Sequence, residues 1–267
     1  MGPTPPSNAG TYIYCVARAH PFENENSPFV AAGLEGHDRV RILTYDDLAA
    51  VVSDARQDQY NISRENLLAH QRVVTQAMTR SDVLPVAFGT VAESDQQVQE
   101  QLLQGMADDL HQALDYVGGR IELDLSVLWN EERLFADIVA ENDDIRVLRD
   151  SLVGQPPEAT HYERVRLGER VAAALQRKSE AEAAALLDAL APLAVETRVN
   201  DNLVDMMLLN AAFLVDKSQE QAFDARVQAL GAAQAERQIF RYLGPLPPYN
   251  FVAIRVHWEE EPVGSAV

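Results

Sequence analysis

Runs of apolar residues alternate along the chain with segments in which apolar residues recur every three or four positions. The first run, Thr11–Ala17, is β-branched and aromatic on both faces, which is typical of a strand covered on both sides. Further strands are expected at Arg39–Tyr45, Ala49–Ser53 and Val83–Val91. Residues 1–10 are rich in Pro, Gly and Ser and predict a flexible N-terminus.

Helical spacing predicts a helix on each side of the strand at 83–91. The first begins at Ser63, and one stripe of it carries Leu67, Gln71, Val74 and Met78. In the second, Ser94 and Gln97 have the spacing of a capping box. A longer apolar stripe follows, formed by Val98, Leu102, Met106, Leu110, Leu114 and Val117. Gly118-Gly119 ends this helix, since glycine accepts left-handed geometry, and closes an expected first domain at 11–118.

A second pattern begins at Gly119. Alternating apolar and polar positions over 121–129 predict a half-buried strand, with Glu122, Asp124 and Ser126 pointing away from the apolar face. Helices are then expected at 131–152 and, behind a capping box of Thr160 and Glu163, at 160–190. The remaining pattern predicts strands at 196–200 and 204–216, a helix at 219–230, and strands at 237–243 and 251–258.

This order is that of a split βαβ, ferredoxin-like domain with extra helices after its first strand. The expected fold class is therefore α+β with two domains. The second, at 119–258, is expected to be a modified ferredoxin-like fold, followed by a flexible tail at 259–267.

Charge narrows the range of partners. The chain has 22 basic and 41 acidic residues, a net charge of -19, which repels phosphate backbones and anionic lipid headgroups. Nucleic acid and membrane partners are therefore not expected. Cys15 is the single cysteine, and we find neither a secretory signal nor a run of about 18 uncharged apolar residues. These features favour a cytoplasmic protein.

Motifs for catalysis or cofactor binding are missing from the sequence. It has no phosphate-binding loop, no helical pair of zinc-binding histidines and no nucleophile elbow. The six histidines are dispersed, and acidic pairs such as Asp46-Asp47 are expected by chance in so acidic a chain. Cys15 lies inside an apolar strand, where a thiol is a small buried hydrophobe rather than a nucleophile. We expect no enzyme activity, no metal and no cofactor.

A stiff connector at 244–252 is the strongest candidate for a binding site. Three prolines stiffen the backbone that carries Tyr249 and Phe251. These side chains would therefore lose little conformational entropy on binding, which suits protein recognition. The candidate protein-binding residues are Pro247, Pro248, Tyr249, Asn250 and Phe251. The alternative, weighted about equally, is that Tyr249 and Phe251 fill the core beside the last strand.

Five segments together resemble the GvpF/GvpL family of gas vesicle proteins. They are Tyr12–Tyr14, His70 in the helix before Leu84–Thr90, the strand Gly119–Trp129, Leu209–Val215 and Gly244–Phe251. One departure is Ala87, where family members often carry a basic residue. The resemblance implies a two-domain α+β protein with a ferredoxin-like C-terminal domain and no enzymatic activity.

The resemblance also implies a partner, the small hydrophobic gas vesicle shell protein, and possible contacts with other gas vesicle accessory proteins. Two roles fit: an assembly factor that prevents premature aggregation of the shell protein, or a minor component retained in the gas vesicle. An enzyme is the third reading, and it would require a concave site with convergent polar groups.

Overall fold

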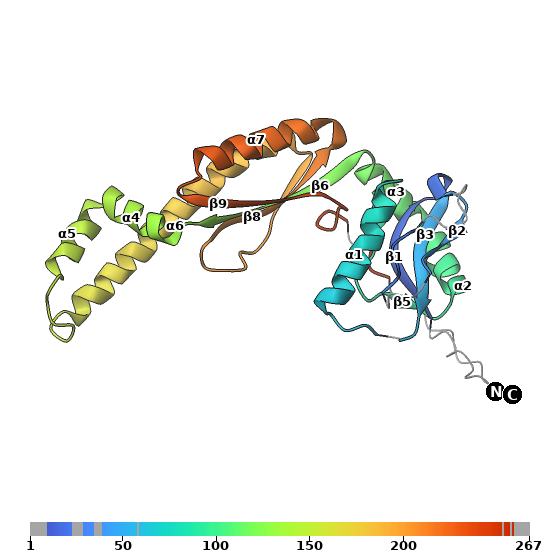
Figure 1. Ribbon diagram of the computed structural model, residues 1–267, viewed down its shortest axis with the longest axis horizontal. Coiled ribbons are helices and arrows are strands. Elements are labelled where there is room, and N and C mark those ends of the chain that lie inside the picture. Colours follow the sequence, from blue (N-terminus) through green and yellow to red (C-terminus); the bar gives the residue numbers. More distant parts are fainter. Residues whose placement is uncertain are drawn as a thin grey trace. The chain divides into compact units, whose positions relative to one another are not determined.

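The computed structural model describes residues 10–22, 29–34, 39–57, 59–252, 254–256 and 258. Of the flexible segments expected at 1–10 and 259–267, only Gly10 is among these residues, and it is the first residue of a strand. The chain divides into two compact units, Met1–Glu122 with Pro245–Val267, and Leu123–Gly244. Each unit combines helices with a β-sheet, in agreement with the expected mixed fold (Figure 1).

The sheet of the first unit has the order β2-β3-β1-β4, and β5 also pairs with β1. Its strands are β1 (Gly10–Arg18), β2 (Arg41–Tyr45), β3 (Leu48–Ala55), β4 (Val83–Pro85) and β5 (Val91–Ala92). Strand β1 is antiparallel to β3, β4 and β5 and is buried on both faces, as its sequence predicts. The short helix η1 (His20–Phe22) follows it.

A bulge at Tyr14 interrupts the alternation of β1. Ile13 pairs with Val52 and Cys15 with Val51, so Tyr14 is an extra residue in the ladder. As a result Tyr14 and Cys15 both join the core cluster of Tyr12, while Ile13 joins the cluster on the other face. Tyr12 and Tyr14 share a face by ordinary alternation, and the bulge adds Cys15 to the same core.

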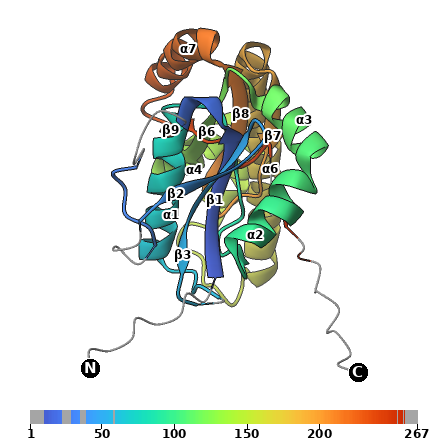
Figure 2. The same ribbon diagram turned by 90° about the vertical axis from the view of Figure 1, so that its right-hand side faces the viewer.

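Helices cover both faces of this sheet. Helix α1 (Arg64–Met78) packs on the Tyr12 face, and α2 (Asp95–Gln97), η2 (Val98–Gln104) and α3 (Ala107–Val117) pack on the other (Figure 2). Ser63 caps α1 as predicted, with its hydroxyl accepting from the Asn66 N–H at 3.2 Å. The helix expected at 94–117 is broken instead, because η2 is a π-helix and Met106 leaves helical geometry.

Two expectations about strands were wrong. The strand expected at 83–91 splits into β4 and β5, because Gly89 has a φ of 85° and the Thr90 N–H turns back to the Ala87 carbonyl. The strand expected at 251–258 forms, among its described residues, an isolated parallel bridge between Ile254 and Val86. This segment joins the first unit rather than the second, since Ile254 packs into the apolar cluster under α3.

In the second unit the sheet order is β7-β8-β6-β9. The strands are β6 (Arg120–Trp129), β7 (Glu196–Val199), β8 (Met207–Asp216) and β9 (Gln238–Leu246). The helices are α4 (Glu131–Glu141), α5 (Asp143–Ser151), α6 (His161–Leu190), η3 (Ala191–Leu193), η4 (Lys217–Gln219) and α7 (Glu220–Ala233). Helix α7 lies along one face of the sheet with the end of α6, whereas α4 and α5 lie beside the rest of α6 (Figure 1).

The capping box expected at the start of α6 does not form. The Thr160 hydroxyl donates to the Pro156 carbonyl and accepts from the Arg164 guanidinium, each at 3.0 Å, so it makes no capping bond to the helix. The Thr160 side chain closes a local turn before the helix instead of capping it. Threonine hydroxyls commonly bond nearby backbone groups in this way.

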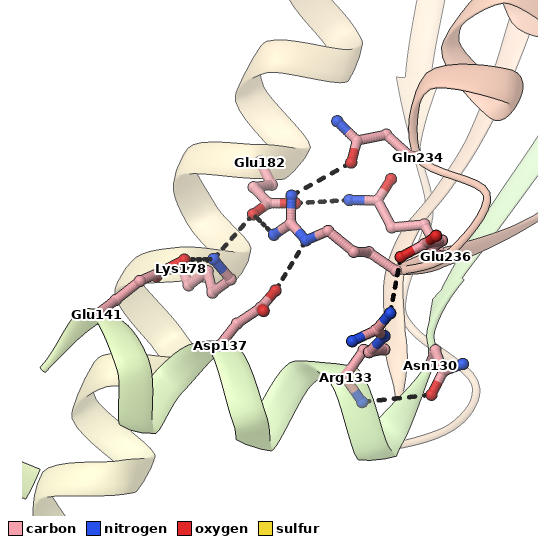
Figure 3. Close-up of polar contacts among 10 residues, drawn as sticks. Asn130, Arg133, Asp137, Glu141, Lys178, Glu182, Gln234 and Glu236 are labelled. Carbon is pink, nitrogen blue, oxygen red and sulfur yellow. Dashed lines mark hydrogen bonds and ion pairs between the residues drawn. The ribbon is translucent and has the colours of Figure 1, made fainter. Parts of the chain in front are cut away.

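Arg237 joins three elements of the second unit. Its guanidinium donates to Asp137 of α4 at 2.8 Å and to Glu182 of α6 at 2.5 Å, and also to Gln234 behind α7 (Figure 3). Lys178 extends the network by bonding Glu141 and Glu182. We call these groups the Arg237 network. It fixes α4 and α6 to the turn that leads into β9.

Candidate protein-binding recess

A recess of about 320 Å³ lies in the first unit, and most of the side chains around it are apolar. It is lined by Leu67, His70, Gln71, Pro85, Val86, Ala87, Phe88, Tyr249 and Val252. These residues come from α1, from the segment after β4 and from the connector. Segments that are far apart in sequence, and that carry the GvpF/GvpL resemblance, therefore meet at one place.

The five candidate residues of the connector have different surroundings. Pro247, Pro248 and Phe251 are buried, and Asn250 is half-buried. Tyr249 is 37% exposed and stands at the edge of the recess together with Leu67, which is 42% exposed. The connector thus divides its aromatics, with Phe251 in the interior and Tyr249 at the surface.

Hydrogen bonds fold the connector into a tight turn. The Tyr249 N–H donates to the Pro247 carbonyl at 2.7 Å, and the Phe251 and Val252 N–H groups both donate to the Pro248 carbonyl. Asn250 anchors the turn by donating its backbone N–H and its side-chain amide to the carboxylate of Glu122. These bonds hold Tyr249 in place at the recess.

Glu122 was expected to point away from the apolar face of its strand, but it is only 1% exposed. Alternation along β6 gave no sign of this burial, because the partner that makes it tolerable, Asn250, is distant in sequence. Burial, with the Cys15 thiol and the Glu122 carboxylate nearby, raises the pKa of Tyr249. Its hydroxyl is therefore neutral at ordinary pH.

A buried polar chain reaches the recess at His70. The Tyr12 hydroxyl lies 2.9 Å from His70 Nδ1 and accepts from the Gly89 N–H at 3.0 Å. The Phe88 ring packs edge-on against both Tyr12 and His70. Burial lowers the pKa of His70 to about 4, so the imidazole is neutral at neutral pH. Gly89, which lies in the Leu84–Thr90 segment of the family resemblance, thus supplies a backbone N–H to this chain.

The chemistry of the recess suits binding. Its lining offers the neutral imidazole of His70 and the amide of Gln71 among mostly apolar side chains. Cys15 is fully buried, and burial raises the pKa of its thiol, which disfavours a nucleophilic thiolate. Among the described residues, no three or more His, Cys, Asp or Glu side chains are grouped as metal ligands. Ala87, the departure from the family pattern, is exposed at the edge and brings no charge.

Comparison with known proteins identifies the family. Residues 10–253 match the family described as gas vesicle synthesis protein GvpL/GvpF. The chain belongs to the GvpL/GvpF family. This match includes α1, the segment after β4 and the whole connector, so every part of the recess lies within the family region.

Relatives of this family member include several gas vesicle F proteins. Gas vesicle protein F of a Streptomyces species is 31% identical over 243 residues, which cover 91% of this chain and 99% of that protein. Gas vesicle protein F of Dolichospermum flosaquae is 28% identical over 225 residues, covering 83% of this chain and 91% of that protein. The Halobacterium salinarum gas vesicle protein L2 is 24% identical and covers 91% of each chain.

The fold is also similar to a solved structure of the same family. The crystal structure of the gas vesicle protein GvpF from Anabaena sp. PCC7120 has a TM-score of 0.79 and 27% sequence identity. The match covers 93% of this chain and 100% of that one. In the described part of this family member, no helix has the length and apolar character needed to span a membrane.

Proposed function

We propose that this protein binds the small hydrophobic gas vesicle shell protein and supports gas vesicle assembly by preventing premature aggregation of that subunit. The observation that carries the proposal is the apolar recess, with Tyr249 and Leu67 exposed at its edge. Rigidly held aromatic side chains beside apolar pockets commonly dominate protein interfaces. The relatives named gas vesicle protein F support the vesicle context.

The strong negative charge of the protein suits this role. A shell subunit that faces gas must expose an apolar surface before assembly, and such surfaces aggregate in water. A binder with a net charge of -19 covers part of that surface while repelling other copies of the complex. We place the protein in the cytoplasm and at the gas vesicle, with other accessory proteins as further partners.

Retention in the vesicle shell as a minor component is the alternative. Both roles use the same contact with the shell protein and differ in whether the contact persists. A pulldown with the shell protein combined with an immunoblot of washed vesicles separates them. An assembly factor is captured by the pulldown and is scarce in washed vesicles, whereas a structural component remains after washing. Failure of the pulldown to capture shell protein would contradict both.

We also propose a domain description for the second unit. Its order of β6, helices, β7, β8, α7 and β9, with the sheet order β7-β8-β6-β9, supports a modified ferredoxin-like domain with additional helices before β7. The proposed domains are the two compact units, of which the first adds the returning segment from Pro245 to the domain expected at 11–118. Neither unit is assigned a catalytic role.

A further inference from the structure

The hydrogen bonds around Tyr12 assign the proton of His70. The Tyr12 hydroxyl accepts from the Gly89 N–H, and His70 Nδ1, at 2.9 Å, is the acceptor that its own proton reaches. A neutral imidazole carries one proton, so when Tyr12 donates to Nδ1 the imidazole proton lies on Nε2. His70 is therefore a fixed donor whose N–H is on the ring edge opposite Tyr12.

This Nε2–H has no hydrogen-bond partner among the described residues, and the atom is buried. The whole residue is 4% exposed, and it lines the recess. A buried donor without an acceptor is unfavourable, and such groups are rare in folded proteins. Gln71 and Tyr249 are the lining residues that carry a side-chain oxygen, and neither is bonded to Nε2.

We propose that His70 Nε2–H is the donor of a side-chain pocket, which takes an aliphatic or aromatic residue of a bound polypeptide and donates to a carbonyl oxygen of that polypeptide. The volume of about 320 Å³ is at the lower end of small ligand sites, roughly 300–1,000 Å³, and suits one side chain with its amide. In taking the shell protein as the polypeptide, this inference rests on the proposed function.

The electrostatics favour a neutral acceptor over an anion. A carboxylate ligand would require a charged imidazolium for strong binding, but burial disfavours the charged form of His70. The apolar wall formed by Pro85, Val86 and Phe88 likewise offers no compensating cation. A peptide carbonyl needs only one donor and leaves the surrounding side chains in apolar contact.

Two substitutions at one position separate the roles of the ring nitrogens. His70→Gln keeps an N–H near the Nε2 position, whereas His70→Asn keeps an acceptor near Nδ1 for Tyr12 and removes the donor. The probes are overlapping shell-protein peptides and N-acetyl-phenylalanine N-methylamide, compared with propylbenzene, which has no carbonyl. Peptide affinity should fall about three- to tenfold in His70→Asn and stay close to wild type in His70→Gln.

Nitrogen-15 NMR of the wild-type protein reads the donor directly. We expect Nε2 to be protonated, and its proton resonance to shift on addition of the amide probe but not of propylbenzene. An unprotonated Nε2, equal shifts with both probes, or equal peptide affinity of His70→Asn and wild type would overturn the inference. If His70→Asn binds the shell-protein peptides as tightly as wild type, the proposed function is still supported and only the role of His70 is contradicted. A response to the amide probe without any peptide binding would instead support the pocket and contradict the proposed function.

Discussion

The Asn250 backbone N–H and side-chain amide both donate to the carboxylate of Glu122, at 2.7 and 2.8 Å. Glu122 is 1% exposed, so these bonds replace water around a buried carboxyl group. They also fix the residue next to Tyr249. The position of Tyr249 at the recess therefore depends on the Asn250–Glu122 pair, although neither residue of the pair lines the recess.

Replacement of Asn250 by Asp should destabilise the protein more than replacement by Ala. Asp has nearly the same shape, but it loses the amide donor and faces the Glu122 carboxylate with a second one. We expect Asn250→Asp to lower the free energy of unfolding by about 2–4 kcal/mol, and Asn250→Ala by about 1–3 kcal/mol. Urea unfolding at neutral pH measures both. Equal stability of wild type and Asn250→Asp would show that the contact is unimportant.

Gly89 should resist substitution because of its backbone rather than its surroundings. Its φ is 85°, and no heavy atom outside Gly89 and its two chain neighbours lies within 4 Å of the place where a Cβ would stand. Gly89→Ala should lower the free energy of unfolding by about 1 kcal/mol, and the β-branched Gly89→Val by about 1–3 kcal/mol. Thermal or urea melts measure the difference.

Gly168 is the matched control for Gly89. It lies inside α6, is exposed, and also has open space at the Cβ position. Gly168→Ala should raise stability by roughly 0.5–1 kcal/mol, because alanine is the better helix former. If both alanine variants change stability in the same direction, backbone strain at Gly89 is not the cause.

Local patterns predicted most elements but not the contacts that complete the site. The stripe behind Ser63 and the alternation over 121–129 depend on the period of one element, and both elements formed. The Tyr14 bulge and the burial of Glu122 depend on partners in other strands and in the connector. Alternation in 251–258 likewise indicates an apolar face but not which unit that face will cover.

For the recess too, local patterns predicted the separate segments but not the contacts between them. The sequence identified Leu84–Thr90, His70 and the connector as separate segments. It left binding by Tyr249 and Phe251 and their packing in the core as alternatives. The structure separates them, with Phe251 interior and Tyr249 at the edge. The hydrogen bond between Tyr12 and His70 joins β1 to α1, so it cannot be predicted from the spacing of residues within one element.

Acid should weaken folding through His70. Its pKa is about 4 in the folded protein against 6.5 for an exposed histidine, so the unfolded chain binds the proton more tightly. The stabilisation is fully present above pH 6.5 and is lost as the pH falls toward 4, by about 1.4 kcal/mol per pH unit and about 3 kcal/mol in all. Urea unfolding across this range measures the slope, which should shrink in His70→Asn. If the free energy of unfolding of His70→Asn falls with pH as steeply as that of wild type, groups other than His70 cause the loss of stability in acid.

The Arg237 network should stabilise the second unit. Arg237→Met leaves Asp137 and Glu182 without their guanidinium partner, although Glu182 retains Lys178. Because these groups are partly exposed, we expect a loss of only about 1–2 kcal/mol in the free energy of unfolding. Arg133→Ala, which removes a more exposed pair with Glu236, should change stability by less than about 0.5 kcal/mol. Similar effects of the two variants would contradict a special role for Arg237.

The most direct measurement is the shell-protein affinity of Tyr249→Ala, taken together with its urea midpoint. Phe251→Ala is the matched control, since Phe251 is 6% exposed and should act on folding, with a loss of about 3–5 kcal/mol. Tyr249→Ala should weaken binding by roughly 1–3 kcal/mol and lower the free energy of unfolding by less than that. A folded Tyr249→Ala protein that binds the shell protein as tightly as wild type would contradict binding at the recess.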